Sequence, residues 1–209
     1  MTARGRFITI EGIEGVGKST NLDFVQNVLE ERGLTVVRTR EPGGTPSAER
    51  IRQVLLELGD ETIPDVAELL LFFAARSLNL ENAIRPALAA GKWVLCDRFT
   101  DATRAYQGAG RGLDMEQIDT LAGWVHDGLE PDLTLLLDAP VETGFERIAA
   151  RRSVDRMESE KKSFYERVRA GYLDLAAASP DRFRVIDARK ALADVQNDIR
   201  TVLANMDIE

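Results

Sequence analysis

The stretch E-G-I-E-G-V-G-K-S-T at residues 11–20 decides the fold. It contains the pattern G-x-x-x-x-G-K-[ST] in full, from Gly12 to Ser19. A β-rich run at 7–10 precedes it, and apolar residues at helical spacing follow it from Lys18, which is the strand, loop and helix context that this pattern requires. Glycines let the backbone N–H groups face a polyphosphate at the start of a helix, where the helix dipole favours anions. The sequence therefore predicts a phosphate-binding loop.

The mechanics of this loop assign the roles of its residues. Lys18 is expected to reach the β- and γ-phosphates of ATP, and the Ser19 hydroxyl to ligate Mg²⁺. Thr20 comes next and is expected to be a helix residue. The predicted nucleotide-binding set is Gly12, Ile13, Glu14, Gly15, Val16, Gly17, Lys18, Ser19 and Thr20.

Strand patterns alternate with helix patterns along the rest of the chain. The strands are expected at 7–10, 34–37, 93–96, 133–137 and 183–186, and the helices from 18 and at 48–58, 67–90, from Asp114, 142–150, about 165–175 and 191–203. This alternation predicts an α/β fold: three αβα layers, with a five-stranded parallel sheet covered by helices on both faces. Function is then expected at the carboxyl ends of the strands.

Composition bounds the possible functions. The chain has 209 residues, which favours one domain spanning 1–209. Its formal charge of −8 disfavours nucleic-acid binding, and it has no apolar run long enough to span a membrane. A single cysteine, Cys96, and a single histidine, His126, cannot build a Cys/His zinc site or an internal disulfide. We expect a cytoplasmic protein with Cys96 buried and inert and His126 on the surface.

Polar residues after the second and third predicted strands indicate a second anion site. Arg40 follows the second strand, and Asp97-Arg98 follows the third, so both border the crevice beside the phosphate loop. Arginine suits a bidentate grasp of a phosphate, which makes Arg98 and Arg40 candidate acceptor ligands. A plain surface ion pair at Asp97-Arg98 is the alternative. Phe72 and Arg76 lie four apart on one helix face and could hold a base, although the spacing fits core packing as well.

Motifs elsewhere in the sequence indicate which class of phosphate-loop protein this is. A GTPase switch needs N-K-x-D and D-x-x-G, and neither occurs in this sequence. A regulatory ATPase that acts through a partner stays open because the loop alone does not exclude it. The second anion site favours a kinase for a small phosphorylated molecule.

Six segments together resemble the bacterial thymidylate kinases, which make dTDP from dTMP and ATP. They are EGIEGVGKST at 11–20, TREPGGT at 39–45, LFFAAR at 71–76, CDRFTDATRAYQGAGRG at 96–112, PDLTLLLD at 131–138 and DRME at 155–158. The resemblance runs nearly from end to end, and YQGAGRG after DR is its most specific part. It implies a Mg²⁺-dependent dTMP kinase for dTTP biosynthesis that forms a homodimer through apolar helices. A kinase for the related dUMP is the alternative enzyme, because a pocket tolerates a missing methyl group at a cost of only about 1 to 3 kcal/mol.

The resemblance also implies roles for single residues on the acceptor side. The phenylalanine matching Phe72 stacks on thymine, and the arginine matching Arg76 bonds the base. The arginine matching Arg98 holds the acceptor phosphate, with those matching Arg40 and Arg52 nearby. The remaining implied contacts are Thr103 at the pyrimidine edge, Gln107 on the base side, Tyr106 against the sugar where a ribose 2′-OH would be, Glu14 near the acceptor sugar and Asp97 near the transferring phosphate and Mg²⁺.

The resemblance places the catalytic arginines in a lid. Some family members carry an arginine within the phosphate loop, but this chain has Ile13, Glu14, Gly15 and Val16 there. The charge-dense segment that follows the fourth strand resembles the short helical lid of the bacterial type, at about 147–162. Arg151 and Arg156 are the expected catalytic arginines, and Arg147 is expected to contact ATP. Phe99 stands where the family commonly has Tyr or His, so it is left out of the predicted site.

Overall fold

A parallel sheet forms the centre of the protein. The computed structural model describes residues 5–58, 62–149, 156–157 and 160–206. Within these residues, five strands pair in the order β2-β3-β1-β4-β5, and all pairings are parallel. The strands are β1 (Phe7–Glu11), β2 (Val36–Arg40), β3 (Trp93–Asp97), β4 (Leu133–Asp138) and β5 (Phe183–Asp187). The central strand β1 is buried along its whole length, as expected for a parallel sheet covered on both faces.

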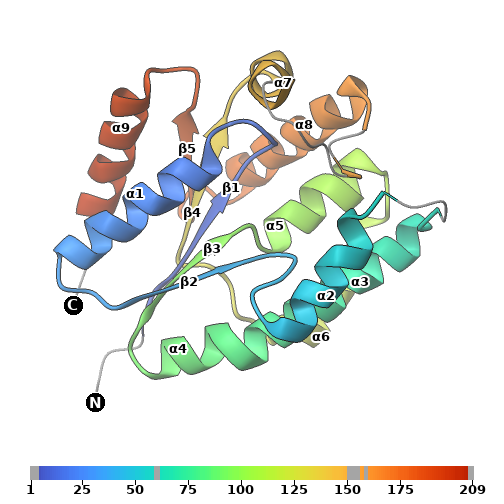
Figure 1. Ribbon diagram of the computed structural model, residues 1–209, viewed down its shortest axis with the longest axis horizontal. Helices are drawn as coiled ribbons and strands as arrows, with labels where there is room; N and C mark the ends of the chain where they lie inside the picture. The colour runs from blue at the N-terminus through green and yellow to red at the C-terminus, as the bar shows by residue number, and fades with distance from the viewer. Residues whose placement is uncertain (1–4, 59–61, 150–155, 158–159, 207–209) are drawn as a thin grey trace.

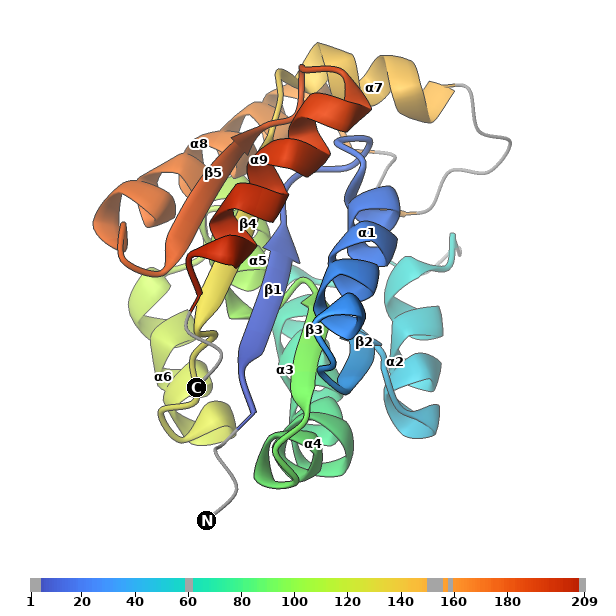
Figure 2. The same cartoon turned by 90° about the vertical axis from the view of Figure 1, so that its left-hand side faces the viewer.

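Helices cover both faces of the sheet (Figures 1 and 2). One face carries α1 (Lys18–Glu31) and α9 (Leu192–Ala204). The opposite side carries α3 (Asp65–Asn79), α4 (Arg85–Ala89), α5 (Thr100–Thr103), α6 (Met115–His126) and α8 (Lys162–Ala178). Two further helices, α2 (Pro46–Leu56) and α7 (Val141–Ala149), lie toward the carboxyl ends of the strands. The predicted fold class is confirmed. None of the described helices is long and apolar enough to cross a membrane.

Two segments of π-helix depart from the predicted pattern. The single helix expected at 67–90 is divided by a π-helical turn, η1 (Leu80–Ile84), between α3 and α4. A second π-helix, η2 (Arg104–Gly110), continues α5, where no helix was predicted. Its glycines disfavour a helix locally, but they permit close packing, because a Cβ on Gly110 would lie 2.7 Å from the ring of Phe164 on α8. Tertiary packing therefore overrides local propensity in the segment that carries Tyr106 and Gln107.

The surface position expected for His126 is wrong. This side chain is only 2% exposed, and its Nε2 lies 2.9 Å from the Thr100 hydroxyl. Its ring stacks on Phe73 and packs against Phe99. Burial lowers the pKa of His126 to about 3, so the ring is neutral at physiological pH. The last turn of α6 is thus a packing surface for α3, which single-helix periodicity does not reveal.

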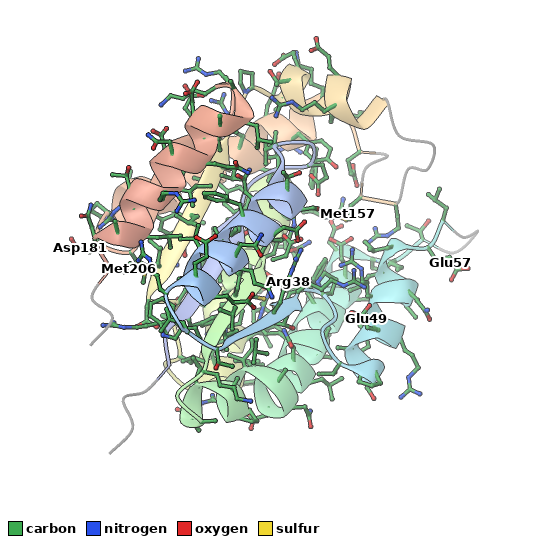
Figure 3. All side chains as sticks on the ribbon, turned by 60° about the vertical axis from the view of Figure 1, so that its left-hand side comes forward. Arg38, Glu49, Glu57, Met157, Asp181 and Met206 are labelled. Carbon is green, nitrogen blue, oxygen red and sulfur yellow. The ribbon has the colours of Figure 1, made fainter. Side chains whose placement is uncertain are left out.

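Side-chain exposure follows the layers. Arg38, Glu57 and Asp181, labelled in Figure 3, are exposed, whereas Met157 is buried. Cys96 is fully buried and is a free thiol, as predicted. Burial raises the pKa of the Cys96 thiol well above its ordinary value, which makes it a poor nucleophile.

Candidate active site

The phosphate loop connects β1 to α1 at the carboxyl edge of the sheet. Gly17 precedes the first turn of α1 with φ 92° and ψ 22°, a left-handed conformation that favours glycine. Gly15, with φ 76°, lies against α7, because a Cβ at this position would approach the Gly144 carbonyl oxygen to 2.2 Å. The loop therefore has the glycines that its curl and its contact with α7 require.

Lys18 lies across the mouth of this loop. Its Nζ donates to the carbonyl oxygens of Gly12, at 3.0 Å, and Ile13, at 2.8 Å. Burial, together with the like charge of Arg98, lowers the pKa of Lys18 to about 8. A polyphosphate at the loop would stabilise the charged ammonium, so nucleotide binding and protonation of Lys18 favour each other.

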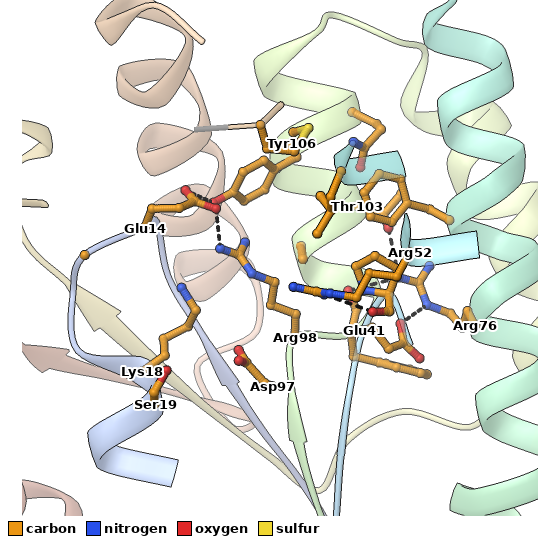
Figure 4. A pocket seen from close by; sticks show the side chains of 18 of the residues that line it. Glu14, Lys18, Ser19, Glu41, Arg52, Arg76, Asp97, Arg98, Thr103 and Tyr106 are labelled. Carbon is orange, nitrogen blue, oxygen red and sulfur yellow. Dashed lines mark hydrogen bonds and ion pairs between the residues drawn. The ribbon is translucent and has the colours of Figure 1, made fainter. Parts of the chain in front are cut away.

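Arg98 connects the phosphate loop to the helices opposite it (Figure 4). Its Nη2 donates to Glu14 Oε1 at 2.7 Å, and its guanidinium lies 4.6 Å from the centre of the Tyr106 ring. The Tyr106 hydroxyl donates to Glu14 Oε2 at 2.6 Å. Arg98 has φ 68°, a conformation that non-glycine residues rarely adopt and that is often retained at functional sites.

The charge on Glu14 follows from these neighbours. Burial alone would raise the pKa of Glu14, but the positive charges of Arg98 and Lys18 lower it below its usual value. Glu14 is therefore ionised and neutralises part of the positive charge of Arg98 and Lys18.

Asp97 and Ser19 lie on the phosphate-loop side of the site (Figure 4). Asp97 Oδ1 is buried and has no hydrogen-bond partner among the described residues. No cluster of three or more His, Cys, Asp or Glu side chains suited to a metal occurs in the described part of the chain. Magnesium needs no such cluster, because it is commonly held by one or two protein oxygens together with substrate phosphates and waters. The unpartnered Asp97 oxygen beside the Ser19 hydroxyl suits that kind of site.

The other end of the site is built around Arg76 on α3. Its Nε donates to Glu41 Oε2 at 2.6 Å, and its Nη2 donates to the Thr103 hydroxyl at 2.9 Å and to the Phe99 carbonyl at 3.2 Å. Arg76 and Glu41 are only 1% and 3% exposed. Arg76 Nη1 is buried and has no partner among the described residues, so it can donate to a ligand. Burial outweighs the attraction of Arg76 and leaves the pKa of Glu41 raised.

One cavity joins the two ends. It is lined by Glu14, Gly15, Gly17, Lys18, Ser19, Thr20, Glu41, Pro42, Arg52, Leu56, Phe72, Arg76, Asp97, Arg98, Phe99, Ala102, Thr103, Tyr106, Gln107 and Met157. Phe72 lines this cavity, whereas its neighbour Phe73 packs in the core between α3 and α6. The structure thus brings most of the sequence-predicted residues into a single cavity.

Some predicted residues lie elsewhere. Arg40 lines an adjacent hollow with Ser19 and Asp97, and its guanidinium makes two hydrogen bonds to Glu49. Gly12, Ile13 and Val16 belong to the loop but do not line the cavity. Arg147 on α7 donates to the carbonyl oxygens of Gly15 and Ala188, at 3.4 and 3.2 Å.

The structure describes only one of the two expected lid arginines. Arg151 lies outside the described residues. Arg156 is described, and it is directed toward α2 and α3: its Nε donates to the Leu55 carbonyl at 2.7 Å and its Nη2 to Glu68 at 2.6 Å. These contacts make Arg156 an anchor that holds Met157 at the cavity.

Sequence reasoning missed three residues that shape the cavity: Glu41, Glu68 and Met157. The signal for Glu41 was its place in TREPGGT, beside Arg40. Glu68 stands among apolar residues in the stretch 66–75, and a fully buried glutamate requires charged partners. Phe99, left out of the predicted site, lines the cavity while its ring is fully buried in the core.

A phosphate loop that shares one cavity with a second arginine site and an aromatic ring defines a P-loop kinase of small phosphorylated acceptors. Comparison with known proteins supports this class of protein. The family model described as thymidylate kinase matches residues 10–199. Thymidylate kinases from Methylococcus capsulatus and Pseudomonas putida are 58% and 56% identical to this chain, over 94% and 95% of both sequences.

A solved structure extends the likeness to three dimensions. The crystal structure of thymidylate kinase from Ehrlichia chaffeensis has a TM-score of 0.79 and 35% sequence identity, and the match covers 96% of this chain and 99% of that one. The chain belongs to the thymidylate kinase family and is a phosphotransferase.

Proposed function

We propose that the protein transfers the γ-phosphoryl group of ATP to dTMP, giving dTDP and ADP. The observation that carries this proposal is that Lys18 of the phosphate loop and Phe72 and Arg76 of the base end line one cavity. Donor phosphates on the loop and an acceptor nucleotide at the other end would then meet beside Arg98. Holding two reactants in this way removes much of the entropic barrier of a bimolecular transfer.

The acceptor site has a group suited to each part of dTMP. Phe72 offers a ring for the base and Arg76 Nη1 a donor for a carbonyl oxygen. Arg98 and Arg52 offer positive charge for the phosphate, and Arg52 is already held by the Pro42 carbonyl at 2.9 Å. Tyr106 and Glu14 lie between them and suit the sugar.

The chemistry needs no histidine. The acceptor phosphate has a second pKa of about 6, so it is largely ionised near pH 7 and can attack without a strong general base. Lys18 and Arg98 would neutralise the charge that develops on the transferring group. No covalent intermediate on the protein is required. His126, buried and neutral behind Phe99, is free for its packing role.

Magnesium is part of the proposal. Ser19 and Asp97 would hold the ion together with phosphate oxygens, which is supported by the unpartnered Asp97 Oδ1. When bound, the ion would supply positive charge that offsets the negative charge of the phosphates. The residues of this chain would orient the phosphates around it through the backbone N–H groups of the phosphate loop and through Lys18.

We treat the chain as one kinase domain, 1–209, with a lid at about 147–162. The contact of Gly144 with Gly15 supports this, because α7 packs against the phosphate loop and its last residues begin that segment. Closure of such a segment would exclude water from the transferring phosphate.

A homodimer and a cytoplasmic location complete the proposal. Apolar side chains lie exposed on the packed pair α3 and α6: Val66, Leu70, Met115 and Trp124, the last of them 79% exposed. Such a surface suits contact with a second copy. A reducing compartment suits a chain whose only cysteine is a buried free thiol.

A panel of acceptors tests the function. The purified protein is incubated with Mg·ATP and, separately, dTMP, dUMP, UMP, CMP, AMP and GMP, and both ADP and the nucleotide product are measured. We expect dTDP from dTMP, weak use of dUMP, and none of UMP, because the proposed position of the sugar would bring a ribose 2′-OH against the Tyr106 ring. ADP release without any acceptor would contradict the proposal and favour a regulatory ATPase.

A further inference from the structure

Glu68 is a buried carboxylate that the proposed mechanism does not use. It lies in the first turn of α3 and is fully buried. Its Oε1 accepts hydrogen bonds from Gln107 Nε2 and Arg111 Nε, both at 2.8 Å. Its Oε2 accepts from Arg111 Nη2 at 3.0 Å and from Arg156 Nη2 at 2.6 Å. One side chain thus joins the π-helix η2, the helix α3 and the segment that carries Met157.

These partners fix the ionisation state of Glu68. Burial alone would raise its pKa, but the hydrogen bonds from Arg111 and Gln107 and the charge of Arg111 lower it below the usual value. An ionised carboxylate only accepts hydrogen bonds. The NH₂ group of Gln107 must therefore face Glu68, and its carbonyl oxygen faces away from Glu68.

The orientation of Gln107 matters because Gln107 lines the cavity beside Thr103 and Arg76. Arg76 has a buried Nη1 donor without a partner, and Gln107 offers a carbonyl acceptor. The imide edge of thymine or uracil carries a carbonyl acceptor at position 4 next to an N–H donor at position 3. Cytosine carries the reverse, with an amino donor at position 4 and a ring nitrogen acceptor at position 3. A fixed donor and a fixed acceptor together complement the imide edge.

We propose that Glu68 is a positioning residue that selects imide bases, because it holds Gln107 with its carbonyl oxygen available to the base. This inference rests on the proposed dTMP site. The contact with Arg156 adds a second effect, since the same carboxylate holds Met157 at the cavity. Base selection and the position of Met157 therefore depend on one buried charge.

Equilibrium binding tests this role without requiring turnover. Dissociation constants of dTMP, dUMP and dCMP are measured for the wild type, Glu68→Gln, Gln107→Ala and the double variant. A glutamine at 68 can donate as well as accept, so Gln107 can turn its NH₂ group toward the cavity. We expect the preference for dTMP over dCMP to fall about tenfold in Glu68→Gln, while the ratio of dUMP to dTMP, both imides, changes less than about twofold.

The double variant separates positioning from a general loss of structure. If Glu68 acts through Gln107, Glu68→Gln changes the dTMP to dCMP preference by less than about twofold in the Gln107→Ala background. Glu68→Asp keeps the negative charge and should retain the dTMP to dCMP preference within about threefold. This variant also tests the role of Glu68 if Glu68→Gln does not fold. Asp101→Asn is the matched control, because Asp101 is a buried carboxylate bonded to Arg182 that does not line the cavity.

Three results would overturn the inference. The first is a preference for dTMP over dCMP that Glu68→Gln leaves unchanged. The others are a change in this preference that Glu68→Gln causes equally in the Gln107→Ala background, or that Asp101→Asn causes as well. Failure of the proposed function would look different. In that case the wild type would make no dTDP in the acceptor panel, whereas the binding ratios would still report whether Glu68 orients Gln107.

Discussion

Replacing Arg76 by methionine separates the two roles of this arginine, one in the fold and one in the cavity. Methionine keeps much of the side-chain volume but removes every donor. Glu41 then keeps only the Asn79 amide, at 3.4 Å, and is left as a buried carboxylate without its ion-pair partner. Removing one member of a buried pair costs about 3 to 5 kcal/mol of the free energy of unfolding.

The assay for this loss is urea unfolding of Arg76→Met and of the double variant Glu41→Gln/Arg76→Met. With a slope of about 2 kcal/mol per molar urea, the midpoint of Arg76→Met should fall by about 1.5 to 2.5 M. The double variant removes the orphaned charge as well, so it should recover most of this loss. It should not recover dTMP affinity, because the Nη1 donor is still missing.

The pH dependence gives an independent check with a defined sign. The pKa of Glu41 is already raised in the folded protein, and loss of Arg76 raises it further. A folded-state pKa above the unfolded value means that stability falls as pH rises through the folded pKa. The stability deficit of Arg76→Met should therefore shrink as pH is lowered from 8 toward 5. A loss below about 1 kcal/mol, or a deficit that grows on acidification, would refute the reasoning.

Three further predictions concern Lys18 and the two expected lid arginines. Since the pKa of Lys18 is about 8 in the free protein, ATP binding at pH 8 to 9 should take up a proton, and KM for ATP should rise above pH 8. Calorimetry in two buffers of different ionisation enthalpy measures this proton uptake. ATP binding without proton uptake would contradict the prediction. Arg151→Ala should lower kcat while KM for dTMP stays within about threefold, as for an arginine on the transferring group. Arg156→Ala should also raise KM for dTMP, because Arg156 holds Met157 at the cavity. Steady-state kinetics of Arg151→Ala and Arg156→Ala distinguish the two roles. Identical effects of the two substitutions on kcat and KM would contradict this difference.

The sequence predicted those features whose signals are local. The phosphate loop carries its own pattern between a strand and a helix, and strand and helix periodicities predicted the sheet and its covering layers. The order of the strands places the ends of β1 and β3 together, which brings Arg98 to the phosphate loop as expected.

Long-range partners explain what could not be predicted. Glu41 and Arg76 are 35 residues apart, and Glu68 and Arg156 are 88 apart, so neither pair leaves a spacing signal. Arg156 was expected among the catalytic groups because its segment resembles the lid of the bacterial thymidylate kinases, and the described contacts direct its side chain to a buried carboxylate on another helix. His126 likewise ends an ordinary amphipathic helix and becomes buried only through Phe73 and Thr100.

The ratio of dTDP formed to ATP consumed tests the central claim most directly. With saturating dTMP and Mg·ATP, the account predicts one dTDP for each ATP consumed and negligible ADP release when dTMP is left out, since donor and acceptor share one cavity. ATP consumption that is independent of dTMP, or ADP formed without dTDP, would contradict it.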